Sequence, residues 1–318
     1  MAADKRRRRG ALSKRPLVLA GLAAFLIVDV ALVGYALSGA NHGVDEASAT
    51  SAPSASAAEE TSTATPTPEI EEAALTAPTR FMSAVDATVA YRASSGTCPA
   101  ATPPVIQKTT DAGSTWISST LTTDLASVFR VQAVDSTYAY LVGLGGVACE
   151  TGLTATYTSG AGFQTYPDRV ASSWYLNPQA ADIVHTPVGD TAAPCATAVS
   201  LAPSNDSTAA VLCDDRTVFR TTDAGVTWDS GVAVPGAAAL ASTGTSYVLG
   251  AQNVEGCTGV SIVGLGAEGD APVTIGCSGD RPTTSADGQE ITLSAAAGSV
   301  WLAIGDSVAV SLDGGVTW

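Results

Sequence analysis

Six cysteines and two histidines are the residues of this chain whose chemistry depends most on spacing. No Cys-x-x-Cys occurs, and neither His42 nor His185 stands beside a cysteine at a zinc-like interval. Thiols without such spacing favour disulfide bonds over metal ligation, and disulfides require an oxidising compartment. We therefore expect no metal site, and we expect disulfides among Cys98, Cys149, Cys195, Cys213, Cys257 and Cys277.

Other catalytic or cofactor-binding patterns do not emerge from the sequence. It has no glycine-rich phosphate loop, no nucleophile elbow and no calcium loop, so we expect no cofactor. The Asp214-Asp215 pair favours a turn over a metal site, and Asn205-Asp206-Ser207 is formally a glycosylation sequon. The acidic residues that stand out instead belong to a repeated phrase.

That phrase is an octapeptide of the form Ser/Thr-x-Asp-x-Gly-x-Thr-Trp, present in three copies at 109–116, 221–228 and 311–318. Each copy follows an alternating, β-branched run, which predicts a strand leading into a turn. The Asp carboxylate can accept backbone N–H groups of the turn, Gly supplies a positive φ, and Trp requires burial. The residues expected to build these turns are Asp111, Gly113, Trp116, Asp223, Gly225, Trp228, Asp313, Gly315 and Trp318.

The octapeptide resembles the Asp-box, also called the bacterial neuraminidase repeat. In sialidases, sortilin-type receptors and photosystem II assembly factors it marks the turn between the third and fourth strands of a β-propeller blade. The resemblance implies an all-β propeller in which the box is structural, so its Asp is not expected to be catalytic.

The spacing of the boxes predicts the number of blades. Asp111 and Asp223 are 112 residues apart, and Asp223 and Asp313 are 90 apart, each about two units of ~45–55 residues. Strand-like runs then give five units, beginning near Arg80, Val128, Ala196, Ala237 and Ile291. The second unit ends in a degenerate box, 158–163, that lacks the Asp. Five blades fit best, and the count becomes six if the segment 172–194 contains another blade.

The resemblance also implies how the ring closes. A fourth strand follows the box in these families, and after the last box we expect a strand near Ile70–Pro78 to complete the final blade; the alternative is a three-stranded blade. Aligned to the repeat, all six cysteines fall on the rim opposite the boxes. The expected pairs are Cys98–Cys149, Cys195–Cys213 and Cys257–Cys277, although the sequence alone permits 15 pairings.

The N-terminal part of the chain predicts a membrane anchor. Residues 1–15 hold seven basic side chains and one acidic one, and Leu17–Leu37 form an apolar stretch of about 20 residues, enough to cross a bilayer. Basic residues before such a stretch place the N-terminus in the cytoplasm. A cleavable signal peptide is the rival interpretation, although its apolar core is usually shorter, ~7–15 residues. Asp29 within the span is either a tolerated acid or a partner for another helix.

The predicted organisation thus has four parts. They are a basic cytoplasmic segment (1–15), a transmembrane signal-anchor helix (16–37), a disordered linker rich in Ser, Thr, Pro, Ala and Glu (38–78) and the propeller (79–318). The protein is expected in the plasma membrane as a single-pass protein with an extracytoplasmic propeller. From Ser38 onward 28 acidic residues face eight basic ones, which argues against nucleic-acid binding.

Two functions follow from the resemblance. The favoured one is a non-catalytic binding or assembly module at the cell envelope, with a protein or an envelope glycan as partner. The alternative is a sialidase-like glycoside hydrolase, which needs an arginine triad, a Tyr nucleophile assisted by Glu, and an Asp acid/base. That family's Arg-Ile/Leu-Pro motif is absent, and the glutamates 150, 255, 268 and 290 stand in no recognisable setting.

Overall fold

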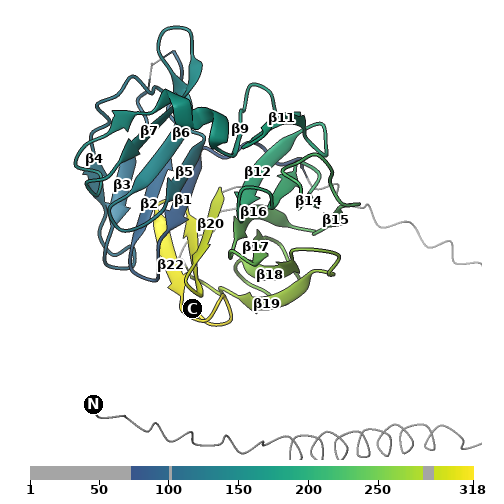
Figure 1. The fold of residues 1–318 in the computed structure, drawn as a ribbon. Coiled ribbons are helices and arrows are strands. Elements are labelled where there is room, and N and C mark those ends of the chain that lie inside the picture. Colours follow the sequence, from purple (N-terminus) through teal and green to yellow (C-terminus); the bar gives the residue numbers. More distant parts are fainter. Residues whose placement is uncertain (1–72, 100–101, 282–289) are drawn as a thin grey trace, which may run out of the picture. The chain divides into compact units, whose positions relative to one another are not determined.

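Short antiparallel strands dominate the computed structural model, which describes residues 73–99, 102–281 and 290–318. The predicted anchor (16–37) and nearly all of the predicted linker lie outside these residues. Within the described residues, no helix is long and apolar enough to span a membrane. The strands form six separate sheets that follow one another along the chain (Figure 1).

Each sheet is a blade of a six-bladed β-propeller, numbered here in chain order. Blade 1 contains β1 (Arg80–Ala84), β2 (Ala90–Ser94), β3 (Ile106–Thr109) and β4 (Ile117–Ser119). Blade 2 contains β5 (Arg130–Ala133), β6 (Ala139–Gly145), β7 (Glu150–Thr156) and β8 (Gln164–Thr165), and the 3-10 helix η1 (Pro167–Ser172) follows it. Blade 3 contains β9 (Tyr175–Leu176), β10 (Ile183–Thr186) and β11 (Gly189–Ala192).

The remaining blades repeat the same order. Blade 4 contains β12 (Ala198–Pro203), β13 (Ala209–Cys213), β14 (Thr217–Thr221) and β15 (Val232–Ala233). Blade 5 contains β16 (Ala237–Ser242), β17 (Ser246–Ala251), β18 (Ser261–Gly266) and β19 (Val273–Cys277). Blade 6 contains β20 (Ile291–Ala296), β21 (Ser299–Ile304) and β22 (Ser307–Ser311). The strands predicted for five units fall within blades 1, 2, 4, 5 and 6, and blade 3 arises from the segment 172–194.

The core is a ring of six apolar clusters, one between each pair of neighbouring blades. Tyr91 and Leu141 pack between blades 1 and 2, and Leu212 and Leu249 pack between blades 4 and 5. Trp301 of blade 6 packs against Met82 and Ala90 of blade 1, so the last blade meets the first. Figure 1 shows β1, β5, β12, β16 and β20, the first strands of their blades, nearest the centre of the ring.

The predicted closing strand is not formed by the described part of its segment. Residues 73–78 are not strand, and blade 6 has three strands among the described residues. The reason is that the segment is bound elsewhere. The backbone N–H of Leu75 donates to Asp214 O in blade 4 at 2.9 Å, and its side chain packs on the cluster between blades 4 and 5.

Each blade presents two kinds of loop on opposite faces of the ring. The octapeptide face carries the turns between first and second strands and those between third and fourth strands. The cysteine face carries the loops between second and third strands and the connections from one blade to the next. All six cysteines lie in or beside loops of the second kind, as predicted.

Candidate functional site

The three octapeptides form the same hydrogen-bonded turn on the octapeptide face. In blade 1, Asp111 Oδ1 accepts the N–H of Thr115 at 2.8 Å, and Asp111 Oδ2 accepts the Thr115 hydroxyl at 2.6 Å. Asp223 and Asp313 accept the corresponding groups of Thr227 and Thr317 at 2.9 and 2.6 Å. The carboxylates are therefore used within their own turns.

These bonds also change the acidity of the carboxyl groups. Hydrogen bonds from the Thr115 and Thr227 side chains lower the pKa of Asp111 and Asp223 below the usual value. The equivalent bond from the Thr317 hydroxyl contributes most to lowering the pKa of Asp313 to about 2. All three groups remain ionised well below neutral pH.

The degenerate turn of blade 2 keeps this geometry without a carboxylate. Thr156 Oγ1 accepts Gly160 N–H at 2.9 Å, as Thr109 Oγ1 accepts Gly113 N–H at 3.0 Å in blade 1. The Thr158 hydroxyl stands in the place of the Asp and accepts Gly162 N–H at 3.0 Å. A hydroxyl oxygen thus replaces one of the two carboxylate acceptors.

The aromatic residue that ends each turn packs toward the preceding blade. Trp116 contacts the cluster between blades 6 and 1, Phe163 the cluster between 1 and 2, Trp228 that between 3 and 4, and Trp318 that between 5 and 6. The turn glycines also lie close to the preceding blade. A Cβ atom added at Gly225, whose φ is +80°, would lie 2.8 Å from Thr191 Oγ1 of blade 3. The turns therefore bind blade to blade.

A second repeated turn, between the first two strands, has side-chain hydrogen bonds that the sequence analysis did not predict. Asp86 Oδ1 accepts the N–H groups of Thr88 and Val89, and Asp135 and Asn205 make the equivalent bonds in blades 2 and 4. In the sequence, this turn is marked by an Asp or Asn that stands two residues before a Thr or Ser. At Asn205 the same three residues also form a glycosylation sequon.

The disulfides have the predicted pairing. Cys98–Cys149 joins the loops of blades 1 and 2, Cys195–Cys213 joins the entry of blade 4 to its second strand, and Cys257–Cys277 lies within blade 5. Among the described residues no group of three or more His, Cys, Asp and Glu side chains is arranged to hold a metal ion.

A cavity of about 200 Å³ lies between blades 1 and 6 toward the cysteine face. Its apolar wall comes from Phe81, Ala93, Val105 and Ala303, and its polar groups include Arg80, Arg92, Gln107 and Asp306. The sequence does not reveal this site, because its residues come from β1, β2 and β3 and from β20, β21 and the turn between β21 and β22. No local motif links positions so far apart in the chain.

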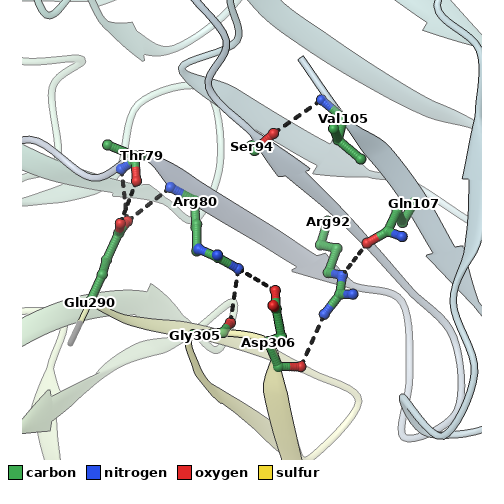
Figure 2. Close-up of polar contacts among 9 residues, drawn as sticks. All are labelled: Thr79, Arg80, Arg92, Ser94, Val105, Gln107, Glu290, Gly305 and Asp306. Atoms are coloured by element: carbon green, nitrogen blue, oxygen red, sulfur yellow. Dashed lines mark hydrogen bonds and ion pairs between the residues drawn. The ribbon is translucent and has the colours of Figure 1, made fainter. Parts of the chain in front are cut away.

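Polar contacts order the cavity, as Figure 2 shows. Arg80 Nη1 donates to Asp306 Oδ1 at 2.6 Å and to Gly305 O at 3.1 Å. Arg92 Nε donates to Gln107 Oε1 at 2.7 Å, and Arg92 Nη1 donates to Asp306 O at 3.3 Å. Glu290 accepts the N–H groups of Thr79 and Arg80 and the Thr79 hydroxyl, which fixes the start of β1 against blade 6.

The two arginines have different roles in this arrangement. The ion pair with Arg80 lowers the pKa of Asp306, and both side chains are well exposed. Burial lowers the pKa of Arg92, whose guanidinium lies 4.1 Å from the ring centroid of Trp116. Arg80 therefore fastens blade 6 to blade 1, and Arg92 presents a stacked guanidinium at the cavity.

Other arginines of the propeller are engaged elsewhere. Arg130 donates to Gln132 on its own strand at 2.8 Å, and Arg281 donates to Trp318 O at 3.3 Å. Arg220 is buried and pairs with Asp229 at 2.6 Å beside a second cavity of about 230 Å³ on the octapeptide face. Arg80 and Arg92 thus meet at the rim between two blades, and Arg130 and Arg281 do not join them.

Comparison with solved structures finds other propellers at low sequence identity. YCF48 from Cyanidioschyzon merolae is 12% identical over 71% of this chain and 79% of that chain, with a TM-score of 0.40. YCF48 bound to D1 peptide is 16% identical over 75% and 64%, with a TM-score of 0.28. A GH74 xyloglucanase from Xanthomonas campestris is 16% identical over 75% and 37%, with a TM-score of 0.29.

The chain spans 64% and 37% of the last two structures, which is less than two thirds of either. No family model matches the sequence, and no curated protein matches it. The assignment as a six-bladed propeller rests on the six sheets themselves and on the apolar clusters that join them.

Proposed function

We propose that the protein is a membrane-anchored, extracytoplasmic propeller that binds a partner protein at the cell envelope without catalysing a reaction. The observation that carries this proposal is the cavity between blades 1 and 6. It combines an apolar wall with an ordered, stacked guanidinium at the edge of the ring. The partner inserts one apolar side chain there, and Arg92 and Gln107 bind its neighbouring polar groups.

The size of the cavity supports a protein partner over a small substrate. Sites for small molecules usually enclose roughly 300–1,000 Å³, whereas this cavity encloses about 200 Å³. That space suits a single side chain. Arginine and tryptophan are also enriched among the residues that dominate protein interfaces, and Arg92 and Trp116 are stacked beside this cavity.

The rest of the chain has supporting roles in this proposal. The octapeptide turns are structural Asp-boxes that hold neighbouring blades together, and the disulfides fix the loops of the cysteine face. Residues 16–37 anchor the protein in the plasma membrane with residues 1–15 in the cytoplasm, and residues 38–78 are a flexible tether. The apolar stretch and the basic residues before it support the anchor.

The topology is tested by proteolysis of intact cells. Protease added outside should cut within 38–78 and release a body of about 240 residues, the length from 79 to 318. A body that remains protected until the cells are lysed would show that the topology is wrong.

Binding at the cavity is tested by site-specific photo-cross-linking in the full-length protein. Val105, 48% exposed, lies at the cavity, and Val188, 69% exposed, lies in the turn between β10 and β11 of blade 3, beside the octapeptide turn of blade 4. A photoreactive residue at 105 should give one discrete protein adduct in cells, and Arg92→Ala should abolish it. The same residue at 188 should give none. Adducts at both positions, at neither, or at 105 despite Arg92→Ala would overturn the proposal.

Glycoside hydrolysis remains the rival function, and the same protein tests it directly. The arrangement of Arg80, Arg130 and Arg281 gives it no support, because only the first of these lines the cavity. We expect a fluorogenic sialoside to remain intact when incubated with the purified protein. Turnover that exceeds the rate of a heat-denatured sample would favour the enzyme.

A further inference from the structure

A cluster of three tyrosines and one arginine lies on blade 2, away from the cavity. Tyr138 precedes β6 and Tyr157 follows β7, so the two residues are neighbours across the sheet. Their rings stack with centroids 4.4 Å apart and an interplanar angle of 7°. Tyr166 meets Tyr157 edge-on at 6.0 Å, and Arg169 belongs to η1. We call these four residues the tyrosine platform.

Arg169 holds the platform in one conformation. Its Nη1 donates to the Tyr138 hydroxyl at 3.1 Å and also to the Tyr157 hydroxyl. Its guanidinium carbon lies 4.7 Å from the centroid of Tyr166. Tyr166 in turn donates to Gln164 Oε1 at 3.1 Å. The cluster is therefore rigid before any ligand arrives, which reduces the entropy lost on binding.

The platform is rigid and yet open to solvent. Tyr157 is 46% exposed, and Arg169 is also exposed. Among the described residues, Nε and Nη2 of Arg169 have no hydrogen-bond acceptor, because its two hydrogen bonds both use Nη1. The exposed ring of Tyr157 thus lies beside two guanidinium nitrogens, Nε and Nη2, whose hydrogens are available to a ligand.

This arrangement matches the chemistry of a sugar ring. The C–H face of a pyranose is flat and apolar and can pack on an aromatic ring, and its equatorial hydroxyls can accept hydrogen bonds from a guanidinium. An inserted peptide side chain would instead need a pocket, and the two cavities described above lie at other blades. The platform therefore favours a carbohydrate over a peptide.

The charge of the protein favours a neutral ligand. From Ser38 onward the chain carries 28 acidic and eight basic residues, and Asp168 is the immediate neighbour of Arg169. A polyanionic glycan would be repelled by this field, whereas a neutral one would not. We propose that the tyrosine platform binds neutral glycan chains whose pyranose rings are flat and carry equatorial hydroxyls, as in β-linked glucans. This site goes beyond the protein-binding function and does not depend on it.

The test compares two hexasaccharides that differ only in charge. Cellohexaose is the neutral probe, and its counterpart oxidised to carboxylate at every C6 is the anionic one. Both are titrated by calorimetry into the full-length protein in detergent. We expect cellohexaose to bind and the anionic chain to bind at least about tenfold more weakly.

Variants assign the binding to the platform. Tyr157→Ala and Arg169→Gln should each weaken cellohexaose binding about tenfold, whereas Tyr157→Phe, which keeps the ring, should change it less than about threefold. Val226→Ser, an exposed change in blade 4, should leave binding unaltered. Melting temperatures of all variants establish that each one is folded.

Three results would overturn the proposal: no binding of cellohexaose, equal or tighter binding of the anionic chain, or unchanged binding by Tyr157→Ala. A proline-rich peptide that displaces cellohexaose from the platform with higher affinity would also overturn it. The adduct at residue 105 is measured separately. Failure of the glycan proposal is therefore distinguishable from failure of the protein-binding proposal.

Discussion

The octapeptide face and the cysteine face are two ends of the same strands, yet they differ in regularity. On the octapeptide face, the Asp–Thr bonds of blades 1, 4 and 6 agree within 0.1 Å. On the cysteine face, the features differ from blade to blade and include a disulfide between blades, a disulfide within a blade, the bound segment 73–78 and a cavity. Repetition thus marks the scaffold, and the irregular face carries what distinguishes this protein.

The largest effect on stability is expected where the repeated turns join the first and last blades. Trp301 is fully buried, and its Nε1 donates to Asp86 O in the turn between β1 and β2 at 2.8 Å. Trp301→Ala should lower the free energy of unfolding by about 3–5 kcal/mol, because it leaves a cavity and an unpaired carbonyl. Equilibrium unfolding in urea measures this loss.

The matched control for Trp301 is Val226, an octapeptide residue that is 69% exposed. Val226→Ala should change the free energy of unfolding by no more than about 0.5 kcal/mol. A loss below about 1 kcal/mol for Trp301→Ala would mean that the junction of blades 6 and 1 does not hold the ring closed.

On the cysteine face, the disulfide between blades 1 and 2 should matter next. Cys98–Cys149 closes a loop of 51 residues, and its removal by a double Cys→Ser substitution should cost about 2–4 kcal/mol. The variant should also weaken the adduct at residue 105, because Cys98 lies in the loop that leads from β2 to β3. Removal of Cys257–Cys277, in blade 5, should leave that adduct intact. Equal loss of the adduct in both variants would contradict a local effect.

The carboxylates of the octapeptide face predict a specific dependence of stability on pH. The folded-state pKa of Asp111, Asp223 and Asp313 is lowered, so each group stabilises the fold above its unfolded pKa of about 3.9. This stability is lost as the pH falls through the folded pKa, which is about 2 for Asp313. Wild type should therefore exceed Asp313→Asn in stability at pH 6, and the difference should shrink between pH 4 and pH 2. A difference that stays constant over this range would contradict the assignment.

The two faces also differ in how far the sequence predicts them. The octapeptides predicted their turns and the strands around them, because local bonds such as those of Asp223 do not depend on distant residues. The aligned repeat also predicted the three disulfides. Blade 3 was missed in the preferred count because it has no octapeptide and β9 is only two residues long.

Contacts between distant residues could not be predicted in the same way. Leu75 binds at blades 4 and 5, although its position next to blade 1 in the sequence suggested a strand in blade 6. The cavity unites Arg92 and Asp306, and the tyrosine platform unites Tyr138 with Arg169. Each of these contacts forms only when the ring closes or when a loop folds back. Ring closure and loop folding leave no local pattern in the sequence.

The smallest effect on stability is expected at the cavity, where function should change most. Gln107 accepts from Arg92 Nε at 2.7 Å and donates to the Ser118 hydroxyl at 3.1 Å, and all three side chains are partly open to solvent. Water can replace these bonds, so Gln107→Ala should lower the free energy of unfolding by about 1 kcal/mol or less. The substitution also releases Arg92 from its fixed orientation, so the adduct at residue 105 should fall several-fold. Urea unfolding and photo-cross-linking of the same preparation measure both quantities. A stability loss as large as that of Trp301→Ala, with the adduct unchanged, would make the cavity a part of the scaffold and would remove the distinction between the two faces.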